Sequence, residues 1–336
     1  MYRLKIDSFC HIMPTKFKNA LLGTAREGSF SQVNIESQPA LWDIDLRRHI
    51  MDRYDGVVQI INIGAPPIEQ VVSDKKKSSE LAQLANDEMA ELIYKYPDYF
   101  VAAVACLPIN DIDATLKEID RAIMDLKFRA VQIHSPMNGN PLDLPELEPI
   151  YEKMCEYDLP ILVHPARSPH FADYTTEDTS KHRIANTIGW PYETACMMLR
   201  LVLSGIMQKY PDLKIVTHHA GGFIPYLEKR IVGGYDSAEM RKRQTFKRGL
   251  TRPPIEYLKR FYLDTALHGH TPGLMCAYAF CGAEKMVFAT DFPYDSQLGH
   301  RYIRENINAV EQMDISDVEK KMIFEDNARK IFQLPI

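Results

Sequence analysis

Eight short apolar segments, each rich in β-branched and aliphatic residues, recur along this chain of 336 residues. They are nearly continuous apolar runs without clean apolar–polar alternation, which is typical of strands buried on both faces of a parallel sheet. The segments are 3–9, 57–64, 100–106, 129–134, 159–164, 213–218, 260–266 and 285–290. No other feature constrains the fold as strongly, because such strands need cover on both sides of their sheet.

Stretches with apolar residues at three- and four-residue spacing, the period of an amphipathic helix, separate many of these segments. The helical stretches are 78–97, 111–127, 143–160 and 192–213. The first begins on a serine and ends at a proline, and the second begins on an aspartate, which are ordinary helix boundaries. Eight strands interleaved with helices favour a (β/α)8 TIM barrel over an open sheet. We expect one such domain over residues 1–336.

Composition excludes several classes of protein. The net charge of −5 gives no basic footprint, so nucleic acid is not an expected partner. The longest apolar runs are about half the length that spans a bilayer, and the first residues lack the apolar core of a signal peptide. Six cysteines without a CxxC pair indicate reduced thiols. We expect a cytoplasmic protein that does not enter a membrane.

Two stretches are longer than ordinary loops, one from Pro14 to about Asp43 and the other from Pro165 to about Gly189. Both follow predicted strands, so both should lie at the C-terminal face of the barrel, where long loops build or cover a site. The alternative is that they are disordered surface excursions.

Polar residues end four of the predicted strands. His11, His164, His219 and Asp291 should therefore converge on one rim of the barrel. Neutral imidazoles and a carboxylate are the ligands of a Zn²⁺-like ion with an open coordination position. Taken alone, each histidine could be a hydrogen-bonded structural residue, and the aspartate could form an Asx turn. Their joint placement on one rim is what indicates a site.

The assignment of four further histidines depends on where strands end. His218 competes with His219, because adjacent strand residues point to opposite faces and only one of the two should face the barrel interior. His134 ends the fourth strand, and His268 and His270 follow the seventh. We treat these three as secondary candidates with supporting or structural roles.

Several blocks of sequence, in order, carry a resemblance to a known family. They are KIDSFCHIMP, LWDIDLRRHIMDRYDGV, YPDYFVAAVACLP, VQIHSPMNGNPLD, LPILVHP, GWPYETA, SGIMQKYPDLKIVTHHAGGFIPYLEKR and FATDFPYD. With them the chain resembles, over nearly its whole length, the decarboxylase branch of the amidohydrolase superfamily, typified by aminocarboxymuconate-semialdehyde decarboxylase. The order and spacing of the blocks make this resemblance more specific than any single motif.

The resemblance implies one divalent metal, usually zinc; we keep manganese and magnesium as alternatives for a loosely bound metal. In the family, the first strand has the form Asp-x-His-x-His, and its two histidines bind the metal together with a strand 5 histidine and a strand 8 aspartate. The matching ligands here are His11, His164 and Asp291, and Phe9 stands where the first histidine would be.

The resemblance also implies catalytic and substrate-binding residues. The histidine before the strand 6 turn is the family's acid–base group and contacts the water on the metal; counted back from Pro225, it is His219. Two arginines of the decarboxylase hold substrate carboxylates, one from each subunit of a homodimer, and Arg47 and Arg230 match them. A guanidinium suits this role because its planar fork fits a carboxylate. The ordinary alternatives are a helix salt bridge for Arg47 and a surface position for Arg230.

The strand 1 phrase is the main departure from the family pattern. On a regular strand, Asp7, Phe9 and His11 share one face and Cys10 points the other way, unless a bulge turns it inward. Phe9 cannot bind a cation, and Asp7 should lie too far down the strand to replace it. Three outcomes stay open: a metal held by the other three ligands, a loosely bound metal, or none.

These observations lead to one principal prediction and two alternatives. The principal prediction is a metal-dependent, non-oxidative decarboxylase of a small unsaturated or aromatic carboxylic acid, in which Asp291 passes a proton to the carbon that loses carbon dioxide. The first alternative is a hydrolase or hydratase on the same barrel, since fold alone does not decide function. The second is a catalytically silent barrel that binds a carboxylate.

Overall fold

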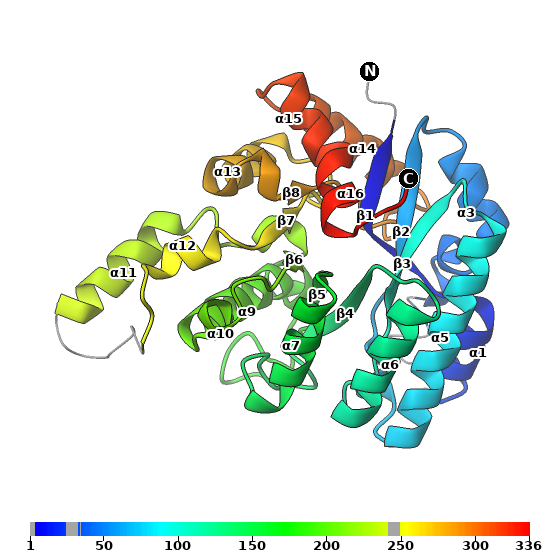
Figure 1. The fold of residues 1–336 in the computed structure, drawn as a ribbon, viewed down its shortest axis with the longest axis horizontal. Coiled ribbons are helices and arrows are strands. Elements are labelled where there is room, and N and C mark those ends of the chain that lie inside the picture. The colour runs from blue at the N-terminus through cyan, green and yellow to red at the C-terminus, as the bar shows by residue number, and fades with distance from the viewer. Residues whose placement is uncertain (1–3, 25–32, 34, 241–248) are drawn as a thin grey trace.

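The computed structural model describes residues 4–24, 33, 35–240 and 249–336. In this part of the chain, eight parallel strands form one sheet whose order follows the sequence from first to last (Figure 1). The strands are β1 (Lys5–Ile12), β2 (Val57–Ile63), β3 (Phe100–Ala105), β4 (Ala130–Ser135), β5 (Ile161–Pro165), β6 (Ile215–Thr217), β7 (Tyr262–Asp264) and β8 (Met286–Val287). Each predicted segment overlaps a strand, and the TIM-barrel prediction is confirmed.

Helices surround the sheet (Figure 1). The α-helices are α1 (Thr15–Leu22), α3 (Ile44–Met51), α4 (Ile68–Val71), α5 (Lys75–Lys95), α6 (Ile112–Met124), α7 (Glu148–Glu156), α8 (Ile184–Thr187), α9 (Gly189–Leu203), α10 (Ile206–Lys209), α11 (Glu228–Met240), α12 (Pro254–Leu258), α13 (Thr271–Cys281), α14 (His300–Glu311), α15 (Asp317–Lys321) and α16 (Asn327–Ile331). Short 3-10 helices are η1 (Pro39–Leu41), η2 (Pro145–Leu147), η3 (His219–Gly221) and η4 (Ala283–Lys285), and a π-helix is η5 (Met322–Asp326). All four predicted helical stretches are helical. The first begins earlier than predicted, because the Asp74 side chain caps α5 by accepting from the amide of Lys77 at 2.8 Å.

Backbone hydrogen bonds join the end of the sheet to its beginning. The amide of Asp291 donates to the carbonyl of Phe9 at 3.1 Å, and the amide of His11 donates to the carbonyl of Phe292 at 2.7 Å. The chain that follows β8 therefore lies along β1. This closure places His11 beside Asp291, although they lie 280 positions apart in the sequence.

The strands bury both faces. One cluster of apolar side chains fills the barrel interior, and a larger cluster lies between the sheet and its helices. Along β2, Ile60 belongs to the interior cluster whereas Ile61 belongs to the outer one, as strand alternation requires. Ile331 and Phe332 pack in the interior cluster with Leu4. The C-terminal segment thus covers the end of the barrel at which the strands begin.

A bulge interrupts β1. Asp7 pairs with Gln59, but Cys10, three residues further along, pairs with Ile61, only two residues further along. The extra residue reverses the alternation of side chains, so Asp7 does not share the face of Phe9. The prediction that the two share a face is wrong for this reason. Cys10 packs in the outer cluster, away from the interior, as predicted.

The two long segments leave the C-terminal ends of β1 and β5, as predicted. The first contains α1 and η1, and its residues 25–32 and 34 lie outside the described part of the chain. The second leads through α8 to Trp190, whose ring centroid lies 5.3 Å from that of His164. This segment therefore reaches the polar rim.

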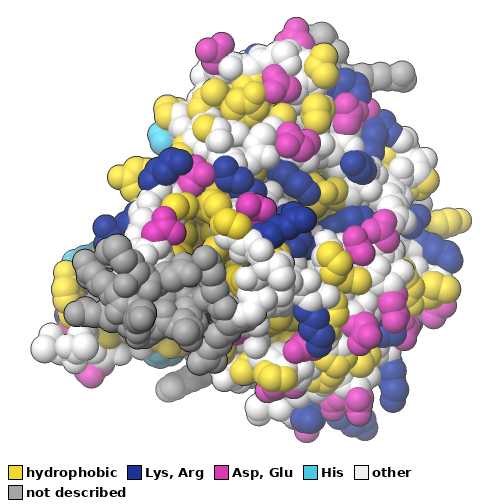
Figure 2. Space-filling model, turned by 60° about the vertical axis from the view of Figure 1, so that its left-hand side comes forward, with side chains coloured by type: hydrophobic (Ala, Val, Ile, Leu, Met, Phe, Trp, Pro, Cys, Tyr) yellow, Lys and Arg dark blue, Asp and Glu magenta, His cyan; other side chains and the backbone are white. Residues whose placement is uncertain are grey.

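Charged side chains of both signs are interspersed on the face drawn in Figure 2. Among the described residues of that face, no continuous field of one sign is seen. No helix in the described part of the chain combines the length and the apolar character that crossing a bilayer requires.

Candidate metal and active site

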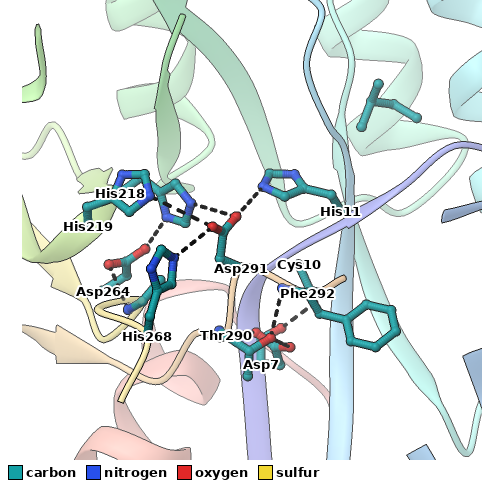
Figure 3. A network of polar contacts seen from close by, with 12 residues as sticks. Asp7, Cys10, His11, His218, His219, Asp264, His268, Thr290, Asp291 and Phe292 are labelled. Carbon is teal, nitrogen blue, oxygen red and sulfur yellow. Dashed lines mark hydrogen bonds and ion pairs between the residues drawn. The ribbon is translucent and has the colours of Figure 1, made fainter. Parts of the chain in front are cut away.

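Asp291 is the centre of the polar rim, and four histidines point toward its carboxylate (Figure 3). The nitrogen–oxygen distances are 3.2 Å from His11 Nε2 to Oδ1, 3.3 Å from His218 Nε2 to Oδ1, 3.2 Å from His268 Nε2 to Oδ2 and 3.9 Å from His219 Nε2 to Oδ2. Asp291 itself has a left-handed backbone, with φ of 63°, four residues after the end of β8. This conformation is uncommon for a residue other than glycine and occurs often at functional sites.

His164 completes the group at the end of β5. Its ring centroid lies 5.0 Å from that of His11 and 5.1 Å from that of His218. Ligand atoms of these three histidines all lie within 4.8 Å of one another, and the same holds for His218, His219 and Asp291. The structure therefore brings together all the residues predicted to bind a metal, His11, His164 and Asp291, with the predicted acid–base residue.

The donor set fits a divalent metal. Nδ1 of His11, of His164 and of His219 is buried and has no hydrogen-bond partner among the described residues, and Nε2 of His11 has only its 3.2 Å contact with Asp291. An unpartnered buried polar atom carries a desolvation cost of about 1–3 kcal/mol, so several at one point indicate a missing partner. Imidazole nitrogens and a carboxylate oxygen are suitable ligands for zinc, and imidazole and carboxylate also bind manganese.

The protonation states of Asp291, His11 and His164 are those that metal ligands need. Burial opposes ionisation of Asp291, but hydrogen bonds from His11 and the other three histidines hold its pKa well below the usual range. Burial lowers the pKa of His11, and burial together with the neighbouring histidines lowers the pKa of His164 well below its usual value. At neutral pH these two imidazoles are neutral and the carboxylate is charged, which is the form that binds a cation.

The two adjacent histidines differ in electrostatic environment. Burial disfavours the charged form of His218, but Asp264 beside its Nδ1 outweighs burial and raises the pKa to about 10. His219 has a lowered pKa because of burial and the charge of His218. His219 is therefore a neutral imidazole near neutral pH, the form required of a general base.

Both His218 and His219 face the site, so the prediction that only one of them does is wrong. Strand alternation does not apply here, because β6 ends at Thr217. His219 and Ala220 then take left-handed conformations with φ of 55° and 51°. This turn brings the two imidazole rings to a centroid separation of 4.0 Å.

Asp264 is a site residue that the sequence reasoning missed. Its carboxylate binds Nδ1 of His218, and its other oxygen accepts from the amides of Ala220 and Ala266 at 2.9 and 3.1 Å. It is fully buried at the end of β7. A buried aspartate that ends a strand is the same signal that pointed to Asp291, and it could have been found in this way.

The secondary histidines fall into three different positions. His268 contacts Asp291 and stacks on Tyr302, with ring centroids 4.3 Å apart. His134 is buried beneath the site, its ring 5.6 Å from that of His164, and burial lowers its pKa to about 3. His270 is exposed at the start of α13. Of these three, only His268 contacts the central carboxylate.

Phe9 lies within the histidine group. Its ring stacks on His218, with a centroid distance of 4.1 Å and an interplanar angle of 20°. Its centroid lies 5.8 Å from that of His11 and 5.9 Å from that of His164. The expected proximity of Phe9 to His11 is confirmed, and an apolar ring fills the volume beneath these imidazoles.

Arg47 is fully buried on α3, below the end of β1. Its Nη1 donates to the carbonyl of His11 at 2.6 Å, and its Nε donates to the side chain of Gln59 at 2.9 Å. The guanidinium also packs over Phe292, 4.5 Å from the ring centroid. These contacts tie Arg47 to the backbone of a site residue, and its predicted role in substrate binding stays a prediction.

Arg230 lies on α11, which projects away from the barrel (Figure 1). Its side chain is exposed. The structure does not bring Arg230 to the histidine group of its own chain. Its predicted contribution across a dimer interface therefore stays a prediction.

Comparison with known proteins decides the family. The amidohydrolase family model Amidohydro_2 matches residues 6–334. This chain belongs to the amidohydrolase family. The predicted family is thus confirmed over almost the whole chain.

Relatives of this amidohydrolase include decarboxylases. Gamma-resorcylate decarboxylase of Rhizobium sp. is 31% identical over 307 residues, which cover 89% of this chain and 90% of the relative. The crystal structure of 2,6-dihydroxybenzoate decarboxylase from Rhizobium superposes with a TM-score of 0.80 at 27% identity, over 98% of this chain and 99% of that one.

A third comparison concerns the metal. The 5-carboxyvanillate decarboxylase of Novosphingobium aromaticivorans was crystallised with manganese and 4-hydroxy-3-methoxy-5-nitrobenzoic acid. Its TM-score with this amidohydrolase is 0.83 at 27% identity, over 98% of this chain and 96% of that one. The predicted activity, that of a carboxy-lyase, is therefore the activity named for these three proteins.

Proposed function

We propose that this amidohydrolase is a metal-dependent, non-oxidative decarboxylase of a small aromatic carboxylic acid. The observation that carries the proposal is the convergence of three predicted histidines, His11, His164 and His219, on the buried carboxylate of Asp291. Relatives that cover about nine-tenths of the chain and act as decarboxylases support it.

His11, His164 and Asp291 would hold the metal. The bound ion would supply a Lewis acid that polarises a substrate oxygen or a water molecule. Zinc is our first expectation for its identity, and manganese, as seen in a structural neighbour, is the alternative together with magnesium. The buried histidine nitrogens that lack partners support this assignment.

His219 and Asp291 would transfer the proton that replaces the carboxylate on the ring carbon. In decarboxylation, the bond between the ring carbon and the carboxylate breaks, and its electron pair stays on the ring carbon. A proton delivered to that carbon then gives the product, while carbon dioxide leaves. Asp291 lies between His219 and His268, whose side chain is 42% exposed, so protons have a path between solvent and the central carboxylate.

A homodimer would complete the substrate site. We propose that Arg230 of one subunit reaches the site of its partner, because the helix that carries it extends away from its own barrel. Arg47 would hold the second carboxylate-binding position. We further propose a cytoplasmic location without nucleic-acid partners, which the free state of all six cysteines and the net charge of −5 support.

An isotope experiment tests the reaction. The metal-loaded enzyme is incubated with 2,6-dihydroxybenzoate or 5-carboxyvanillate in deuterium oxide, and separately in ¹⁸O-labelled water, and the products are examined by mass spectrometry. We expect carbon dioxide release and one deuterium on the carbon that carried the carboxylate. Solvent ¹⁸O in the organic product would instead indicate a hydrolase or hydratase. The absence of turnover on a panel of aromatic acids would contradict the proposal.

A further inference from the structure

Phe9 removes a metal ligand from the first strand, and the structure shows what fills its surroundings. The ring of Phe9 lies flat beneath His218, with centroids 4.1 Å apart and planes inclined by 20°. His218 therefore rests on the side chain that replaced the missing ligand. Both are fully buried, so the position of the imidazole is fixed by packing.

Asp264 fixes the orientation of the same imidazole. Its carboxylate accepts from Nδ1 of His218, and its backbone partners, Ala220 and Ala266, fix the carboxylate in turn. Asp264 holds a proton on Nδ1 of His218, so a bound cation would displace the proton from Nε2, which points toward Asp291 (Figure 3). A carboxylate on the outer nitrogen is the usual support for a histidine that binds a metal through its other nitrogen.

The distances around Asp291 match a coordination sphere. With metal–ligand bonds of about 2.0–2.1 Å, ligand atoms that are neighbours around the ion lie about 3 Å apart, also where a further position stays open for substrate or water. Oδ1 of Asp291 lies 3.2 Å from Nε2 of His11 and 3.3 Å from Nε2 of His218. His164 has a ligand atom within 4.8 Å of those of both histidines.

His219 is placed differently. Its Nε2 lies 3.9 Å from the other carboxylate oxygen, Oδ2, and its ligand atoms lie within 4.8 Å of those of His218 and Asp291 but are not grouped with those of His11 and His164. The adjacent histidines thus have separate positions, one inside the ligand group and one at its edge.

We propose that His218 is the fourth protein ligand of the metal, and that it replaces the strand 1 ligand lost at Phe9. The metal is then held by His11, His164, His218 and Asp291, with Asp264 as the residue that positions His218. His219 stays outside the coordination sphere and is available for proton transfer. This inference rests on the metal site of the proposed function but not on the reaction catalysed there.

Metal binding, and not turnover, is the measurement that tests it. The His218→Ala and His219→Ala variants are loaded with Zn²⁺, and the dissociation constant of each is measured by competition with a chromophoric chelator. We expect His218→Ala to weaken binding by at least about 100-fold, since even supporting residues of metal sites change affinity by about 10–100-fold. His219→Ala, the matched neighbour, should stay within about 3-fold of the native protein. Equal affinity of His218→Ala and the native protein would overturn the proposal.

A compensating variant makes the test specific. Phe9→His in the His218→Ala background restores a ligand at the strand 1 position, and we expect it to recover Zn²⁺ binding to within about 10-fold of the native protein. Circular dichroism of the metal-free forms separates loss of a ligand from loss of folding. If the double variant folds but still binds as weakly as His218→Ala, then Phe9 and His218 are not interchangeable and the proposal fails.

The native protein offers a measurement that needs no substitution. X-ray absorption of the Zn²⁺-loaded protein counts imidazole ligands, and we expect three. Two imidazoles would exclude His218 and overturn the proposal even if the variants proved unstable. If the protein binds zinc through three imidazoles but releases no carbon dioxide, the assignment of His218 as a ligand stands and only the proposed decarboxylase activity is contradicted.

Discussion

Asp7 at the beginning of the barrel binds Thr290 at its end: the Asp7 carboxylate accepts from the Thr290 amide at 3.0 Å and from its hydroxyl at 2.6 Å. This pair fixes the chain on both sides of the site, since Phe9 lies two residues after Asp7 and Asp291 directly follows Thr290. Burial raises the pKa of Asp7 to about 7, although the two bonds from Thr290 oppose the increase.

We expect Thr290→Val to reduce the free energy of unfolding by about 1–3 kcal/mol, because the variant removes a hydroxyl that donates to a buried carboxyl group. The affinity for the metal should also decrease, because the backbone that positions the Asp291 carboxylate is then held less firmly. Urea denaturation and chelator competition measure the two effects. Thr290→Ser is the control and should retain native stability and affinity, because serine keeps the donor.

His219→Ala should reduce kcat by about 10²–10⁴-fold, the usual contribution of a general acid–base residue. Steady-state kinetics on the best aromatic acid measure the effect, at saturating metal. His270→Ala is a matched control, because His270 is exposed on the same rim and should leave kcat unchanged. A nearly native rate for His219→Ala would assign proton transfer to another residue.

Stability should fall as pH rises from about 4.5 to about 7, and Glu69 contributes to this dependence. Burial raises the pKa of Glu69 from 4.5 to about 7 in the folded protein. Within this range Glu69 loses its proton in the unfolded chain but keeps it in the folded chain, so a rise in pH favours unfolding. Above about pH 7 the contribution of Glu69 to the free energy of unfolding is constant. Across the whole range this contribution decreases by about 3 kcal/mol.

The Glu69→Gln variant isolates this contribution, because glutamine is similar in size and does not ionise. We expect its free energy of unfolding to exceed that of the native protein at pH 8 and to approach it at pH 4.5. Urea denaturation at four pH values between these limits provides the comparison. Parallel pH profiles for the two proteins would contradict a raised pKa at Glu69.

Gly222→Ala should destabilise the turn that carries His219. A Cβ atom at Gly222 would overlap the carbonyl oxygen of Pro191, and φ is 60°. We expect a loss of at least about 2 kcal/mol and a reduced kcat, because strain and a backbone clash act together. Gly139→Ala is the control: its φ is also positive, at 85°, but nothing lies within 4 Å, so it should lose only about 1 kcal/mol.

Arg47→Met tests whether Arg47 supports the fold or holds substrate. The guanidinium donates to His11 and Gln59 in a fully buried position. We therefore expect the variant to lose about 3 kcal/mol of stability, since hydrogen bonds to a buried charge are lost. A raised KM with unchanged unfolding would instead support a direct contact with the substrate carboxylate.

The sequence by itself determined the barrel and most of the rim. The apolar runs predict all eight strands because local periodicity reports burial directly. His11, His164 and Asp291 could be placed for the same reason: each directly follows or ends such a run, and parallel strands bring those ends together. The resemblance to the decarboxylases added the roles that position alone does not give.

Only the tertiary structure decided which way individual side chains point. The bulge in β1 turns Asp7 away from the face of Phe9, and the left-handed turn at His219 brings both adjacent histidines into the site. Both features depend on hydrogen bonds and packing between distant segments, such as Asp264 with Ala220, which no local pattern reports. A regular alternation of faces holds only while the strand is regular, and the site is built where the strands cease to be regular.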